Sequence, residues 1–132
     1  MTSMEDTMLM SYVLDAGKNR HNMDTLSEIH LNHKTISFKD LVGTGKKEIN
    51  FSEVDVEKAK DYAAEDADIT FRLYKKFQKS LKDEKMINIY EIFEKPLLKI
   101  LAFMEIEGVK IDNKFLKSLS NKFEKKIIKI QN

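Results

Sequence analysis

The sequence is 132 residues long, with 42% hydrophobic and 34% charged residues, one proline, four glycines and no cysteine. This length fits one small domain or a piece of a larger protein, and the scarcity of glycine and proline favours helices. Without cysteine, disulfides and thiolate zinc sites are excluded. No apolar run approaches the ~18 residues of a membrane-spanning helix, and the first ten residues lack a signal-peptide pattern, so we expect a soluble, intracellular chain.

The net charge of +1 conceals an uneven distribution. Residues 110–132 carry seven lysines against Asp112 and Glu124, a local balance of +5, which leaves −4 for residues 1–109. A basic end of this kind can form a surface for nucleic acid. A solvated face of lysine side chains without a ligand explains the pattern equally well.

Hydrophobic residues recur at helical spacing along most of the chain. The spacing predicts helices over residues 6–15, 23–31, 37–43, 55–82, 87–107 and from 112 to the C-terminus. Residue types that cap helices predict several of the starts, at Asp6, Asp24, Ser52 or Asp55, and Asp112. The expected ends are at Gly17, Gly43, Asp83-Glu84 and Gly108.

The connections between these helices contain no run of strands. Residues 44–54 are predicted to be a loop or an extended link, and residues 109–111 at most a bridging strand. Pro96 removes a backbone donor and should kink or divide the helix in which it lies. The sequence therefore predicts an all-α chain of about five or six helices, whose amphipathic faces have no sheet to cover.

Two stretches suggest a phosphate-binding loop and a metal-binding histidine pair, but neither matches the pattern that its chemistry requires. A phosphate-binding loop needs G-x-x-x-x-G-K-[ST], but before "LVGTGKK" Asp40 occupies the first glycine position, and Lys47 occupies the hydroxyl position. The stretch is predicted to be an ordinary loop. His30 and His33 have the i,i+3 spacing of some metal ligands. With no cysteine and no acid in register, they are better interpreted as solvated or hydrogen-bonded histidines.

The stretch "DYAAEDADIT", residues 61–70, places four acids in a predicted helix. At about 100° per residue, Asp61, Glu65 and Asp68 fall on the face that carries the lysines and arginine. Asp66 falls instead within the apolar stripe. The neighbours that define this stripe are Ala59, Tyr62, Ile69, Leu73 and Phe77. An ionised carboxylate there needs a partner, because uncompensated desolvation costs several kcal/mol or more.

Two interpretations of Tyr62 and Asp66 remain open on the residues alone. The i,i+4 spacing puts the phenol and the carboxylate on one helix face. Asp66 could be hydrogen-bonded to a tertiary partner, such as an arginine or a helix N-terminus. Alternatively, it could be a metal ligand beside a phenol that orients a water molecule.

The motif and its flanks resemble the family A DNA polymerases, the family of bacterial DNA polymerase I. "YAAEDADIT" is similar to the third motif, Tyr-x-x-x-Asp, of their proofreading 3′–5′ exonuclease domain. The upstream stretch "EDTMLMSYVLDAGKNRHNMDTLSEIHLNHKTISF" looks like the segment before that motif, and "YEIFEKPLLKILAFMEIEGVKID" like the junction with the polymerase domain. The resemblance runs in order through essentially the whole chain.

The resemblance implies a fold, an activity and a set of site residues. The family's exonuclease domain has an RNase-H-like α/β fold and cuts the 3′-terminal phosphodiester of single-stranded DNA with two divalent metals, Mg²⁺ or Mn²⁺/Zn²⁺. By resemblance, Asp66 is a metal ligand and Tyr62 positions the attacking water. Residues 1–85 would form the later part of the exonuclease domain, and residues 86–132 the junction and first polymerase helices.

The same resemblance implies partners and a location. DNA, as a single-stranded 3′ end and as a primer-template, is the expected partner, in the bacterial cytoplasm at the nucleoid and without a membrane. The segment after the junction leads toward the thumb, which grips the DNA backbone. Five lysines are therefore candidates for phosphate contacts, namely Lys114, Lys117, Lys122, Lys125 and Lys129. A plain solvated face stays the alternative.

Only one of the three exonuclease motifs is found. The family's Asp-x-Glu and its second aspartate should lie upstream, Asp6 matches a later position, and the polymerase motifs should lie beyond Asn132. One carboxylate and a phenol cannot fix two hard cations. We therefore expect this fragment to bind no metal and to be catalytically inactive by itself. As alternatives, it could be a helical self-association module that forms a homo-oligomer, or a DNA-backbone-binding module.

Overall fold

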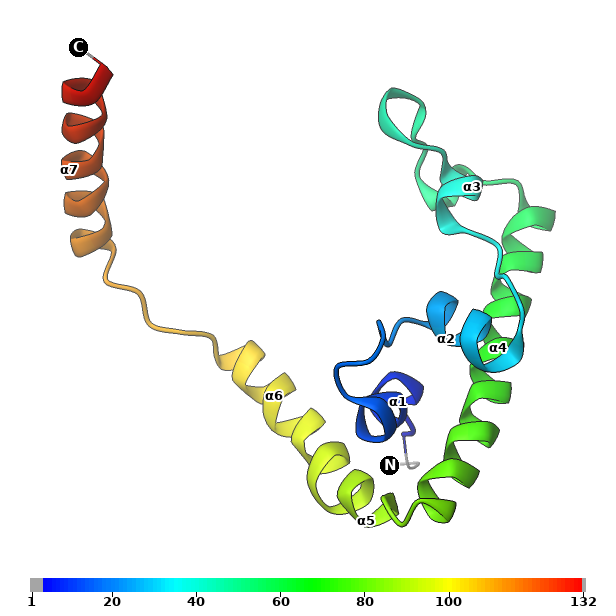
Figure 1. The fold of residues 1–132 in the computed structure, drawn as a ribbon. Coiled ribbons are helices and arrows are strands. Elements are labelled where there is room, and N and C mark those ends of the chain that lie inside the picture. Colours follow the sequence, from blue (N-terminus) through cyan, green and yellow to red (C-terminus); the bar gives the residue numbers. More distant parts are fainter. Residues whose placement is uncertain (1–3, 132) are drawn as a thin grey trace. The chain divides into compact units, whose positions relative to one another are not determined.

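The computed structural model describes residues 4–131, and these contain helices and connecting segments but no strand (Figure 1). Two compact units divide between Lys99 and Ile100. The α-helices are α1 Thr7–Asp15, α2 Met23–Leu31, α3 Phe38–Val42, α4 Val56–Asp83, α5 Ile87–Ile89, α6 Lys95–Glu107 and α7 Asn113–Gln131. Two 3₁₀ turns, η1 Gly45–Lys47 and η2 Phe51–Glu53, and one π-helical turn, η3 Tyr90–Glu94, complete the elements. The predicted all-α fold is confirmed.

Three of the predicted N-caps are confirmed by hydrogen bonds. The carboxylate of Asp6 accepts from the Leu9 amide at 3.0 Å. Asp55 accepts from the amides of Glu57 and Lys58, and Asp112 from that of Phe115. Such bonds satisfy amides that the first helical turn leaves without an internal acceptor. The long helix and the C-terminal helix therefore begin where local side-chain chemistry places them.

The prediction that Asp24 caps the second helix is wrong. Helix α2 begins at Met23, after Asn22, so that Asp24 lies in its first turn. There its carboxylate accepts a hydrogen bond of 2.7 Å from the hydroxyl of Thr35. An acid in the first turn is still favourable, because it faces the positive end of the helix dipole.

Residues 109–111, expected to be at most a bridging strand, form an irregular link between α6 and α7. The loop predicted over 44–54 contains the turns η1 and η2. Pro96 has the expected effect. The π-helical turn η3 ends just before it, with the Lys95 amide bonded to the Tyr90 carbonyl. Widening of this kind accommodates the carbonyl of residue 92, which proline can neither bond nor approach at normal helical spacing.

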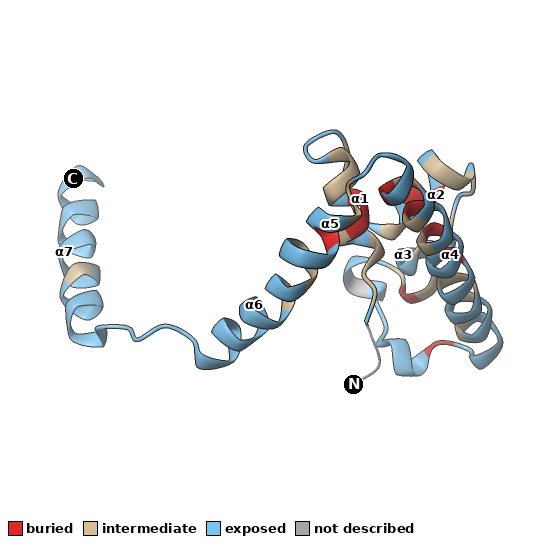
Figure 2. Ribbon diagram, turned by 90° about the horizontal axis from the view of Figure 1, so that it is seen from below, coloured by how far each residue is buried: buried red, intermediate tan, exposed pale blue. Residues whose placement is uncertain are grey.

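The core of the first unit lies where α1, α2 and the segment from α5 to η3 pack against α4 (Figures 1 and 2). Its buried residues are Met10, Leu26, Ile69, Leu73, Phe77, Leu81 and Tyr90. Four of these recur every fourth residue along α4, which is the stripe that the sequence predicts. The same helix presents Asp66 just under one turn, and Tyr62 about two turns, before the first of these buried residues, Ile69.

In the second unit, the end of α6 and all of α7 have no fully buried side chain. Large apolar residues such as Phe103, Met104, Phe115 and Phe123 are each more than half exposed. In the described residues, no helix is long and apolar enough to cross a bilayer.

Candidate functional site

Asp66 is half-buried on α4, and its Oδ1 atom is buried without a hydrogen-bond partner among the described residues. Burial raises the pKa of this carboxyl above its ordinary value, and the nearby hydroxyl of Tyr62 opposes that rise. The negative charges of Asp24 and Glu65 raise the pKa further. An oxygen in this position has lost water without receiving a protein donor, which is unfavourable unless a cation or another ligand group approaches it.

Tyr62 stands one turn before Asp66 in an aromatic cluster. Its ring centroid lies 6.0 Å from that of Phe38 and 6.2 Å from that of Phe51, and those two rings stack at 5.8 Å. These separations are typical of favourable aromatic pairs. Burial, followed by the charge of Asp66, raises the pKa of the Tyr62 hydroxyl, so the phenol stays protonated and can donate a hydrogen bond at neutral pH.

A depression of about 450 Å³ gives access to Asp66 from the solvent side. Its lining comes from α4 and from the start of α1. The lining residues are Glu5, Thr7, Asp66, Ala67, Thr70, Phe71 and Tyr74. The depression therefore combines a partly desolvated carboxylate with hydroxyl groups and an apolar wall, a mixture typical of ligand sites.

Glu65 does not lie on the solvated face on which the helical wheel places it. Its side chain is 17% exposed, and both of its oxygens are occupied. Oε1 accepts from His33 Nε2 at 2.7 Å, and Oε2 accepts from the Ile36 amide at 2.6 Å. These bonds lower the pKa of Glu65, with the Ile36 amide the larger cause. The wheel is correct for Asp61 and Asp68, which are exposed.

His30 and His33 do not point to a common site. The His30 ring meets Phe77 edge-on at 4.9 Å, and burial lowers the pKa of His30. His33 points to Glu65 instead. Its assignment as a hydrogen-bonded histidine is thus confirmed.

The site offers a divalent metal one suitable ligand atom but does not enclose the metal. The partnerless Oδ1 of Asp66 is a hard oxygen of the kind that Mg²⁺ and Mn²⁺ prefer. However, among the described residues no three acidic, histidine or cysteine side chains are grouped so that they could hold an ion. Tyr62 and Asp66 lie on neighbouring turns of one helix, and within the part of the chain that the structure describes no group of further ligands for a two-metal centre lies beside them.

The candidate DNA-contacting lysines all lie on α7 and are exposed. At about 100° per residue, Lys114, Lys117, Lys122, Lys125 and Lys129 fall within half of the helix circumference. The stripe of Phe115, Leu119 and Phe123 lies beside them, centred roughly 130° away. The helix is thus amphipathic, with its positive side chains free to meet anionic groups.

The model of a 3′–5′ exonuclease family matches residues 1–82. The chain belongs to this 3′–5′ exonuclease family. DNA polymerase I of Rhizobium leguminosarum is 48% identical over 118 residues, covering 89% of this chain and 12% of the relative. DNA polymerase I of Pseudomonas aeruginosa is 38% identical over 127 residues, covering 96% of the chain and 14% of the relative. That of Borreliella burgdorferi is 38% identical over 112 residues, covering 85% and 12%.

These matches confirm the resemblance found from the motif and its flanks. The family consists of enzymes that generally use divalent metals. The chain spans about one eighth of the length of these curated relatives, and the matched regions include both the Tyr62–Asp66 helix and, beyond residue 82, part of the segment that follows it.

Proposed function

We propose that this chain supplies the Tyr62 and Asp66 side chains to a 3′–5′ exonuclease site of a DNA polymerase I, which removes nucleotides from a single-stranded 3′ end during DNA synthesis and repair at the nucleoid. The observation that carries the proposal is the buried Oδ1 of Asp66, which has no partner among the described residues and lies in the helix that matches the exonuclease family. A carboxylate kept in this state is suited to a cation.

The roles of the two side chains follow from their chemistry. Asp66 offers a hard oxygen ligand, and a bound Mg²⁺ or Mn²⁺ would stabilise charge on the attacking and leaving oxygens. The phenol of Tyr62 remains protonated, because burial raises its pKa. It can therefore donate to, and orient, a water molecule beside the Asp66 carboxylate. The aromatic contacts with Phe38 and Phe51 limit the positions that this hydroxyl can take.

A transplant tests the proposal. The 118 aligned residues replace their counterpart in the Rhizobium leguminosarum enzyme, after trimming of labelled single-stranded DNA has been measured for that parent. We expect the chimera to retain metal-dependent trimming. Asp66→Ala should lower its rate by at least roughly 100-fold, more than the loss of an outer-shell group, while polymerisation is unchanged. Asp68→Ala, an exposed acid on the same helix, is the matched control. Unchanged trimming in Asp66→Ala would refute the assignment.

We propose further that the chain of 132 residues alone does not trim DNA, because one carboxylate cannot hold two hard cations. The assay uses the same substrate with Mg²⁺ or Mn²⁺. Metal-dependent trimming that disappears in Asp66→Ala would contradict this expectation and would place the missing ligands within the chain itself.

The lysine face of α7 supports primer-template DNA as a partner of the whole enzyme. Phosphate contacts are independent of sequence and weaken with salt, with a slope of about −0.9 per contact on duplex DNA. Replacing Lys114, Lys125 and Lys129 by alanine should reduce the magnitude of the slope by up to roughly that amount for each lysine. Lys79 and Lys82, exposed on α4, provide the control replacements. An unchanged slope would leave α7 with a solvated face only.

Self-association is the second candidate, favoured by the exposed apolar side chains of residues 100–132. Light scattering after size-exclusion chromatography distinguishes the two. A stable dimer that fails to bind DNA would support a helical association module, whereas a DNA-binding monomer would support the lysine face.

A further inference from the structure

In the described part of the chain, a single side chain of α4 makes the hydrogen bonds that attach the segment leading from α2 to the aromatic cluster. Residues 32–37 connect the end of α2 to α3, and Phe38 is the first residue of α3. Both oxygens of Glu65 bond to this segment, one through the His33 ring and one through the Ile36 amide. The Glu65 carboxylate is thus a bidentate clamp placed on α4 immediately before Asp66.

The other attachments of the segment hold it to α2 instead. The Ser27 hydroxyl donates to the His33 carbonyl at 2.8 Å, and the Thr35 hydroxyl donates to Asp24 at 2.7 Å. These bonds fix the shape of the segment and its relation to α2. Among the hydrogen bonds of the described residues, only those of Glu65 join the segment to the Tyr62–Asp66 turn, so the position of the segment on that turn depends on Glu65.

The end of the segment bears directly on Tyr62. Ile36 lies two residues before Phe38, whose ring is 6.0 Å from the Tyr62 ring and stacks on Phe51. A shift at Ile36 would therefore move Phe38, one of the two aromatic rings that pack against Tyr62. Charge-assisted hydrogen bonds such as those of Glu65 are stronger than neutral ones, which suits a carboxylate to this function.

We propose that Glu65 is a positioning residue for Tyr62, acting through residues 33–38 to hold the Tyr62 ring in place beside Asp66. Glu65 itself does not need to touch DNA or metal, since both of its oxygens are occupied by protein donors. The importance of Glu65 for catalysis rests on the proposed exonuclease function. Its effect on the position of Tyr62 does not rest on that function, so the effect on position and the effect on catalysis can be tested separately.

The first test is spectroscopic and uses the 132-residue chain labelled with 3-fluorotyrosine. The chain has four tyrosines, and Tyr62→Phe identifies the ¹⁹F signal of Tyr62. We expect Glu65→Ala to shift or broaden that signal and to leave the other three in place. Glu65→Gln retains an acceptor for the Ile36 amide and should restore the signal. Asp61→Ala, which removes an exposed acid beside Tyr62, is the control.

A Tyr62 signal that is the same in Glu65→Ala and in the unmodified chain would overturn the proposal. If Glu65→Ala unfolds, as judged by circular dichroism, His33→Leu decides instead. It removes one of the two donors at a partly exposed position and should shift the same signal. An unshifted signal there would also overturn the proposal.

The second test uses the transplanted chimera. Glu65→Ala should lower kcat for trimming roughly 10- to 100-fold, the usual effect of removing a group that orients a site residue. KM should change little, because Glu65 makes no contact with DNA in this proposal. A shifted Tyr62 signal with unchanged kcat would overturn the positioning role. Full activity in Asp66→Ala would refute the proposed function, and would leave the ¹⁹F result to decide the Glu65 clamp.

Discussion

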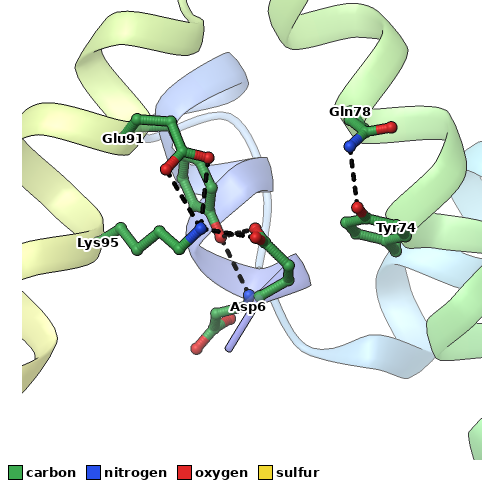
Figure 3. A network of polar contacts seen from close by, with 7 residues as sticks. Asp6, Tyr74, Gln78, Glu91 and Lys95 are labelled. Carbon is green, nitrogen blue, oxygen red and sulfur yellow. Dashed lines mark hydrogen bonds and ion pairs between the residues drawn. The ribbon is translucent and has the colours of Figure 1, made fainter. Parts of the chain in front are cut away.

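Tyr90→Phe removes one oxygen atom from the core and should destabilise the first unit substantially. Tyr90 is fully buried, and its hydroxyl donates to Glu5 Oε2 at 2.9 Å and accepts from the Asp6 amide at 3.1 Å. Lys95 donates to the same carboxylate at 2.6 Å, and Figure 3 shows the ammonium group of Lys95 and the backbone nitrogen of Asp6 within this one network of polar contacts. The hydroxyl thereby connects η3 to the start of α1.

The magnitude follows from the two bonds. A hydrogen bond to a charged group contributes about 1.5–3 kcal/mol and a neutral one about 1 kcal/mol. Phenylalanine fills the same space, so no cavity term is added. The Lys95 bond to Glu5 persists in the variant, so the carboxylate keeps a partner. We therefore expect a loss of about 2–4 kcal/mol in the free energy of unfolding.

The measurement is urea unfolding followed by far-ultraviolet circular dichroism at pH 7. Tyr74→Phe is the matched control, since its half-buried hydroxyl accepts one bond of 2.8 Å from Gln78 (Figure 3). That variant should lose about 1 kcal/mol or less. A Tyr90→Phe loss no larger than that of Tyr74→Phe would refute the inference that the hydroxyl joins η3 to α1.

Three further predictions concern stability. Asp66→Ala should stabilise the chain by about 1–2 kcal/mol at pH 7 in EDTA, because an unpaired buried oxygen is removed. Since the pKa of Asp66 is raised, this gain, measured against the exposed control Asp68→Ala, should shrink at acid pH. No gain in stability at pH 7 would contradict the prediction. Phe77→Ala should cost about 3–5 kcal/mol in urea unfolding, against less for Phe71→Ala, whose ring is 54% exposed. Burial raises the pKa of Tyr90 from 10.0 to about 12. The stability present below pH 10 should therefore fall by about 2 kcal/mol between pH 10 and 12, out of about 3 kcal/mol over the whole titration, and a Tyr90→Phe chain should lack that part of the loss.

Helix starts could be predicted where their chemistry is local. Asp6, Asp55 and Asp112 each precede a helical pattern, and each caps its helix by bonding amides two or three residues away. Asp24 satisfied the same rule, but Asn22 is an equally good cap residue. Asn22 is the cap, and the hydroxyl of Thr35, eleven positions further along the chain, donates to Asp24 instead. No local pattern contains this tertiary hydrogen bond.

The site shows the same division. Helical periodicity separates Asp66 from the exposed Asp61 and Asp68, because the angle around one helix is a local property. It fails for Glu65, which lies at the edge of the solvated face and is covered by a segment some thirty positions earlier in the chain. The one available signal was His33, whose hydrogen-bonded state could be predicted but whose partner could not.

The long helix α4 joins two regions of different stability. From Ile69 to Leu81 every fourth residue is fully buried against α1, α2 or the α5–η3 segment. From Val56 to Asp66 no residue is buried, and contacts come from single side chains such as Glu65 and Phe38. Amides in regions with few buried contacts open with a lower free energy than the core. Hydrogen exchange measured by mass spectrometry should therefore be faster in peptides covering residues 56–66 than in those covering 69–81.

This difference follows from the chemistry of Asp66. A carboxylate oxygen without a partner, such as Oδ1 of Asp66, is unfavourable in a packed core, so it is better tolerated where the helix is held by few contacts. Tyr90→Phe should accelerate exchange over residues 69–81, whose core it weakens, and Glu65→Ala over residues 56–66. Equal protection in both halves of α4 would show that the helix opens as one unit and that Asp66 lies in the core after all.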